Sequence, residues 1–162
     1  MSNQVTMPEV YKIALNNELR GAGFYSSMAR RSKNSATADI FHKLSEEEKE
    51  HHRLFQMLLD KTGDTSKDSI LGSETAAFLK SLFKTSVFPA DAEELTDRIT
   101  PEEALSIGIQ AEKDSILLYH ELFTQTENNE IQAMLSKLLL EEKMHLVELR
   151  EQLEEMQRPK LN

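Results

Sequence analysis

Glu48-Lys49-Glu50-His51 and Glu142-Lys143-Met144-His145 are two copies of one short phrase, Glu-x-x-His. A further glutamate stands thirty residues before the glutamate of each copy, and a tyrosine follows that glutamate by seven residues. These partners are Glu18 with Tyr25 for the first copy, and Glu112 with Tyr119 for the second. A shift of 94 positions carries the first set onto the second without a gap. Chance rarely produces such a register, so we interpret the chain as a duplicated unit.

The composition predicts an all-α protein. The 162 residues include only 5 glycines, 4 prolines and no tryptophan, while Leu, Ala, Glu and Lys are abundant. This length suits one domain spanning residues 1–162. The absence of cysteine excludes disulfides and Cys₄ iron centres.

Charge and hydropathy exclude several classes of partner. The formal net charge of −9 argues against nucleic acid, because phosphate binding needs clustered Lys and Arg. No apolar run approaches the roughly 18 residues needed to span a bilayer, so no membrane association is expected. The N-terminal residues lack the basic and apolar segments of a signal peptide. We therefore expect a cytoplasmic protein.

Apolar periodicity predicts four long helices in two hairpins, at about 6–61 and 100–158. The first and third expected helices cover about 7–31 and 100–126. The second follows a turn at 32–35 and runs to about 61, and the fourth follows a turn at 127–129 and runs to about 158. Both hairpins begin with the Thr-x-x-Glu capping box, at Thr6 and Thr100. The second helix is expected to end near Gly63 and Asp64, and Pro159 should stop the last one.

The segment between the hairpins breaks the pattern. Residues 73–84 predict one short helix, and Pro89 follows it. A connection of this length can travel the length of a bundle, as does the single long crossover of a ferritin-like four-helix bundle. The segment could instead form a lid or a dimer contact.

Each repeated glutamate and histidine lies in a helical stripe that should be buried. An unpaired carboxylate in such a stripe is costly unless it is protonated or bound to metal. The helical phase selects Glu142 over Glu141 as the inward carboxylate. The neighbours of the first phrase fall mostly off the stripe and are expected to be solvated. They are Glu46, Glu47, Lys49, Glu50 and His52.

A glutamate and a histidine three residues apart share one helix face and can bind one ion together. Two such helices, with one glutamate from each of two others, supply four carboxylates and two imidazoles. This mixed set suits two divalent iron or manganese ions, although zinc can also occupy such a site. A lone Glu-x-x-His usually has no function, and buried histidines are often merely hydrogen-bonded core residues. Tyr25 and Tyr119 either pack in the core or hydrogen-bond the metal-bound carboxylates. His42, His52 and His120 are expected to face solvent.

From Glu9 to about Met156, the sequence resembles the rubrerythrin-like branch of the ferritin-like di-iron carboxylate proteins. The resemblance rests on the two Glu-x-x-His phrases and on their glutamate and tyrosine partners. It implies a four-helix bundle whose two iron ions cycle between Fe²⁺ and Fe³⁺. The implied ligands are Glu18, Glu48, His51, Glu112, Glu142 and His145. The resemblance further implies reaction with hydrogen peroxide or dioxygen, and a homodimer.

Two departures from rubrerythrins weigh against efficient peroxidase turnover. Full rubrerythrins carry a rubredoxin domain with a Cys₄ iron, for which this chain has no cysteine. They also carry an additional glutamate one turn after the ligand of the third helix, where this chain has Ser115. An external electron donor, rubredoxin-like or a flavoprotein, could replace the missing domain. The alternatives to an oxidoreductase are a non-catalytic iron-handling or metal-sensing protein and a structural helical bundle.

Overall fold

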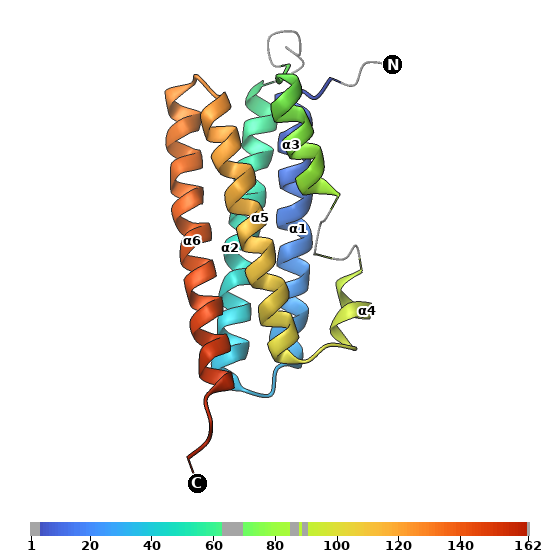
Figure 1. Ribbon diagram of the computed structural model, residues 1–162, viewed down its shortest axis with the longest axis vertical. Helices are drawn as coiled ribbons and strands as arrows, with labels where there is room; N and C mark the ends of the chain where they lie inside the picture. Colours follow the sequence, from blue (N-terminus) through green and yellow to red (C-terminus); the bar gives the residue numbers. More distant parts are fainter. Residues whose placement is uncertain (1–3, 63–69, 85–87, 89–90, 162) are drawn as a thin grey trace.

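The computed structural model describes residues 4–62, 70–84, 88 and 91–161, and within these ranges it contains six helices and no β-strand. Four long helices run side by side as a bundle (Figure 1). They are α1 (Met7–Arg31), α2 (Ser35–Thr62), α5 (Pro101–Gln125) and α6 (Asn129–Gln157). The predicted all-α four-helix bundle is confirmed. None of the helices in the described ranges combines the length and apolar character needed to cross a membrane.

Helices α1 and α5 begin and end at equivalent positions of the 94-residue repeat. The hydroxyl oxygen of Thr6 accepts a hydrogen bond from the backbone N–H of Glu9, whose carboxylate accepts one from the Thr6 N–H. Thr100 and Glu103 form the same capping box at the start of α5. The bounds of α1 and α5 differ by 94 positions at both ends. Local capping therefore sets equivalent helices in the two hairpins.

The core consists of two apolar clusters at different levels of the bundle. The first is built from residues such as Tyr11 on α1, Phe55 on α2, Leu122 on α5 and Leu135 on α6. The second contains Phe24, Phe41, Leu105 and Leu149 from the same helices. Along every long helix, the repeated glutamates and histidines fall between the residues of the two clusters. A polar layer therefore divides the core across its middle.

The connection between the hairpins carries two short helices, whereas the sequence predicted one. They are α3 (Ser73–Phe83), which contacts α5, and α4 (Ala92–Thr96), which contacts α1 (Figure 1). Helix α4 was missed because five residues are too few to show a period; Asp91 caps its start. A buried hydrogen bond of 2.7 Å between the Ser27 and Thr96 hydroxyls holds α4 to α1. Gly63, Asp64 and Pro89, which the sequence analysis used as helix stops, lie outside the described residues.

Candidate metal centre

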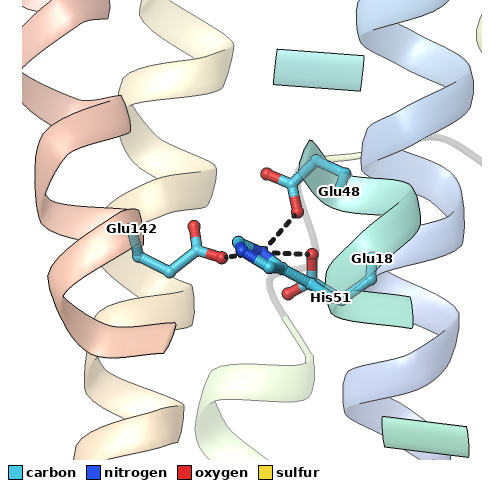
Figure 2. A group of neighbouring side chains, drawn as sticks. All are labelled: Glu18, Glu48, His51 and Glu142. Carbon is cyan, nitrogen blue, oxygen red and sulfur yellow. Dashed lines mark ion pairs between the residues drawn. The ribbon is translucent and has the colours of Figure 1, made fainter. Parts of the chain in front are cut away.

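The polar layer brings together all six residues that the sequence singled out as metal ligands, and each is at most 3% exposed. Their ligand atoms form two groups in which every atom lies within 4.8 Å of the others. One group is Glu18, Glu48, His51 and Glu142, whose side chains converge from three helices (Figure 2). The other is Glu48, Glu112, Glu142 and His145. Glu48 and Glu142 belong to both groups.

The two shared glutamates each offer one oxygen to each histidine. Glu142 places Oε1 2.6 Å from Nδ1 of His51 and Oε2 3.5 Å from Nδ1 of His145. Glu48 places Oε2 3.4 Å from Nδ1 of His51 and Oε1 3.6 Å from Nδ1 of His145. Both carboxylates are therefore positioned to bridge two cations.

The two remaining glutamates belong to one group each. Glu18 Oε2 lies 3.5 Å from Nδ1 of His51, and Glu112 Oε1 lies 3.6 Å from Nδ1 of His145. Each group thus contains one unshared carboxylate, one imidazole nitrogen and two bridging oxygens. Exchanging residues across the 94-position repeat turns one group into the other.

The hydrogen bonding of the cluster is incomplete in a way that a cation would satisfy. Among the described residues, the buried side-chain N and O atoms without a hydrogen-bond partner are Glu18 Oε2, His51 Nδ1, Glu112 Oε2, Tyr119 Oη, both Glu142 oxygens and His145 Nδ1. All but the tyrosine hydroxyl belong to the candidate ligands. A buried polar atom without a partner is costly, and these atoms converge on common points. The donor set therefore fits two metal ions.

Four of these groups have raised pKa values when no metal is bound. Burial, with the negative charge of Glu142, raises the pKa of Glu18 to about 7. Burial, with the charges of Glu142 and Glu48, raises the pKa of Glu112 well above its usual range. Burial alone would lower the pKa of both histidines, but the surrounding carboxylates raise both well above their usual range. Protons thus supply positive charge that divalent cations would supply instead.

Glu142 behaves in the opposite way. Burial alone would raise its pKa, but contacts with Glu112, His145 and His51 together hold that pKa well below the usual range. The carboxylate at the centre of the cluster is therefore ionised, as a bridging ligand must be.

The outward nitrogens of both histidines contact carboxylates of the opposite hairpin. Nε2 of His51 lies 2.8 Å from Glu141 Oε2, and Nε2 of His145 lies 2.5 Å from Glu47 Oε2. A proton on Nε2 leaves Nδ1 free to bind metal and makes the imidazole a stronger ligand. The expectation that Glu47 is merely solvated was wrong: it is half-exposed, and one oxygen reaches inward. The repeat was the available signal, since Glu47 and Glu141 are also 94 positions apart.

The two tyrosines of the repeat differ in their contacts. The Tyr25 hydroxyl donates a hydrogen bond of 2.8 Å to Glu112 Oε1. Burial, with the charge of Glu112, raises the Tyr25 pKa well above its usual range, so the hydroxyl stays a donor. Gly108 makes room for it, since a Cβ there would lie 3.0 Å from the Tyr25 hydroxyl oxygen. The buried Tyr119 hydroxyl has no hydrogen-bond partner among the described residues, so its predicted role stays a prediction.

The other candidate positions lie outside the cluster. His42 and His120 are exposed and His52 is half-exposed, and none belongs to either group. Ser115 is half-buried on α5 and lines a small cavity beside α1.

Comparisons with known proteins agree with this geometry. The rubrerythrin family profile matches residues 9–153. A crystal structure from Thermotoga maritima, described as a ferritin-like diiron-carboxylate protein, is 26% identical in sequence. The alignment covers 96% of this chain and 99% of that one, with a TM-score of 0.77, so the fold is ferritin-like. No curated protein sequence matches the chain. The match over nearly all of its length shows that the chain belongs to the rubrerythrin family.

Proposed function

We propose that the protein is a di-iron oxidoreductase that uses hydrogen peroxide or dioxygen as oxidant. The observation that carries the proposal is the placement of Glu48 and Glu142, each of which offers one oxygen to each half of the cluster. Two cations held by these shared carboxylates would lie close enough to act on one small oxidant together. A purely structural role would need one metal site, whereas this cluster provides two adjacent groups of candidate ligands.

The two halves of the cluster supply matched ligand sets. Glu18 with His51 would hold one ion and Glu112 with His145 the other, with the shared glutamates between them. Four carboxylates balance the charge of two divalent ions. Carboxylate and imidazole ligands without sulfur favour iron or manganese, and zinc can compete in a purified sample. When bound, a ferrous pair supplies one electron per ion, which with two protons reduces one hydrogen peroxide to two waters.

The surrounding residues hold this centre and keep it dry. Glu141 and Glu47 fix the orientation of the imidazoles, and Tyr25 fixes Glu112. Apolar clusters above and below exclude bulk water. Return of the ions to the ferrous state needs an electron donor. We propose an external one, rubredoxin-like or a flavoprotein, because the chain has no cysteine for a Cys₄ iron. We further propose a cytoplasmic homodimer.

Rapid mixing tests the proposal. Anaerobic protein loaded with two Fe²⁺ per chain is mixed with hydrogen peroxide, and in a separate series with dioxygen, while ferric absorbance is followed. We expect oxidation at least tenfold faster than that of free Fe²⁺ in the same buffer. Glu18→Gln should lose this acceleration, whereas the exposed control Glu154→Gln should keep it. Oxidation of fully loaded protein no faster than free Fe²⁺ with both oxidants would reject an oxidoreductase.

The second candidate is a protein that binds iron without turning over an oxidant. It is favoured by Ser115, which stands where rubrerythrins carry their additional glutamate. This candidate predicts stoichiometric metal binding with no accelerated oxidation. A storage protein would also need a closed shell of many subunits, which size-exclusion chromatography with light scattering would reveal.

A further inference from the structure

The outward face of α6 carries three large apolar side chains in contact with solvent. Leu140 is 62% exposed, Met144 is 48% exposed and Val147 is 41% exposed. They follow one another at intervals of four and three residues, so they form one stripe along the helix. Helix α6 lies at an edge of the bundle, packed against α5 and α2 and apart from α3 and α4 (Figure 1). Single exposed apolar residues are common, but a continuous stripe of them marks an interaction surface.

The repeat shows that this face is apolar in the second hairpin and charged in the first. The residues 94 positions before the stripe lie on α2 and are Glu46, Glu50 and Arg53, all of them exposed. Ion pairs occupy this part of α2: Lys49 Nζ lies 2.6 Å from Glu46 Oε1, and Arg53 pairs with Glu50. The buried faces of α2 and α6 are equivalent, so packing of the core does not account for the difference. The stripe on α6 therefore indicates a contact outside the chain.

Charged residues continue the apolar stripe at the same spacing. Lys137 stands three residues before Leu140, and Glu151 stands four residues after Val147; both are exposed. Lys137 makes only a loose ion pair within the chain, with its Nζ 3.8 Å from Glu141 Oε1. At the rise of an α-helix, the whole stripe is about 21 Å long. One end of it is basic and the other end is acidic.

This order of residues is complementary to itself. Lys137 and Glu151 each lie seven residues from Met144. If a second copy of α6 packs antiparallel about a two-fold axis at Met144, Lys137 faces Glu151 of the second copy at both ends. Leu140 then faces Val147 of the second copy, and Met144 faces its own counterpart. A parallel pair would instead bring lysine against lysine and glutamate against glutamate, so charge complementarity favours the antiparallel pair.

A groove beside the stripe extends the same complementarity. It lies between α5 and α6, has a volume of about 630 Å³, and is lined by Phe123 and Leu140 among others. Lys137 and Lys143 also line it, and its described lining contains no carboxylate. In the antiparallel arrangement, the acidic end of the second copy's stripe, at Glu151, approaches this basic groove.

We propose that α6 is the contact helix of the homodimer and packs antiparallel on α6 of a second copy, with Met144 at the two-fold axis. The inference rests on the homodimer of the proposed function and adds its surface and register. Burial of the apolar stripe stabilises the pair. The charges at its ends set the orientation, because exposed ion pairs contribute more to specificity than to affinity. Glu142 and His145 lie on the buried side of α6, so the pair uses a face that the metal cluster does not.

Sedimentation velocity of the full chain, loaded with Fe²⁺ under anaerobic conditions, tests the surface over a series of protein concentrations. Salt at about 150 mM screens the repulsion between two chains of net charge −9. We expect wild type to be a dimer, and Met144→Glu to raise its dissociation constant at least 100-fold by placing two carboxylates at the axis. Met57→Glu is the control, because Met57 is 46% exposed on α2, and it should leave the dimer unchanged. A dimer unchanged in Met144→Glu would overturn the α6 surface and leave the homodimer standing, whereas a monomeric wild type would overturn both.

A charge exchange tests the register. Lys137→Glu and Glu151→Lys each bring like charges together in the antiparallel pair and should each weaken the dimer at least tenfold. The double variant exchanges the two charges and should return the dissociation constant to within threefold of wild type. A double variant no tighter than the single variants would overturn the antiparallel register, because in a parallel pair each residue faces its own counterpart. Circular dichroism confirms that each variant is folded. None of these readouts involves oxidation of iron, so failure of the proposed oxidoreductase and failure of this interface are distinguishable.

Discussion

Replacing Glu18 by glutamine should stabilise the metal-free protein and abolish its stabilisation by metal. Glu18 is 2% exposed, and its Oε2 has no hydrogen-bond partner among the described residues. Burial, with the charge of Glu142, raises its pKa from 4.5 to about 7. An ionised Glu18 without a cation therefore costs folding free energy, and a neutral amide of the same shape removes that cost.

The size and pH range of the effect follow from the pKa. The folded state holds the Glu18 proton more tightly than the unfolded state, so wild type loses stability as pH rises from 4.5 to about 7. Each pKa unit corresponds to about 1.4 kcal/mol, which gives a gain of about 3 kcal/mol for Glu18→Gln above pH 7. For a chain of this size that gain raises the melting temperature by roughly 6–12 °C. Below pH 4.5 both proteins carry a neutral side chain, so the difference should vanish.

Urea denaturation in EDTA, followed by circular dichroism at pH 4.5 and pH 8, measures this difference. Glu154→Gln serves as the control, since Glu154 is exposed on α6 and should change stability little at either pH. In a second arm, thermal denaturation is followed with Fe²⁺ in place of EDTA. We expect Fe²⁺ to raise the melting temperature of wild type and not that of Glu18→Gln. If metal-free Glu18→Gln were less stable than wild type at pH 8, the view that ionised Glu18 destabilises the metal-free protein would be refuted. An undiminished metal-dependent rise would show that Glu18 is no ligand.

Four further results are expected. Gly108→Ala should destabilise the protein by about 1–3 kcal/mol in urea denaturation, because its Cβ would lie 3.0 Å from the Tyr25 hydroxyl oxygen. Gly23→Ala should instead stabilise the protein by about 0.5–1 kcal/mol, because among the described residues no atom beyond the chain neighbours and the local helix backbone lies within 4 Å of the new Cβ. Glu47→Ala and Glu141→Ala should each weaken metal binding by about 10–100-fold in chelator competition, because one imidazole loses the carboxylate that contacts its Nε2. Unchanged metal affinity in both variants would show that these carboxylates do not support the histidine ligands. Metal affinity should rise between pH 5 and pH 8 in calorimetric titration, because two carboxyl groups with raised pKa values must first lose their protons; a flat profile would contradict this.

Much of the site could be predicted from the sequence because the regular geometry of an α-helix fixes which residues share a face. Residues three and four apart share a face, so Glu48 and His51 had to point the same way once α2 formed. The 94-position repeat then supplied the equivalent residues of the second hairpin. Capping boxes at Thr6 and Thr100 located the helix starts, and the structure has both. These are local properties, which a linear pattern can express.

Helix α4 and the inward contact of Glu47 required the folded chain. A five-residue helix has too little periodicity to be predicted, and α4 depends on tertiary contacts such as the hydrogen bond between Ser27 and Thr96. Glu47 lies off the buried stripe of its own helix, and only the approach of α6 brings His145 within 2.5 Å of it.

By itself, the sequence determined four amphipathic helices in two equivalent hairpins, and a glutamate and histidine set on their buried faces. Only the tertiary structure decided which carboxylates are shared between the two halves and which carboxylate contacts the outward nitrogen of each imidazole. The physical reason is that these features depend on distances between helices. Such distances are fixed by how the side chains of different helices pack together. The hydrophobic periodicity of a single helix carries no information about them.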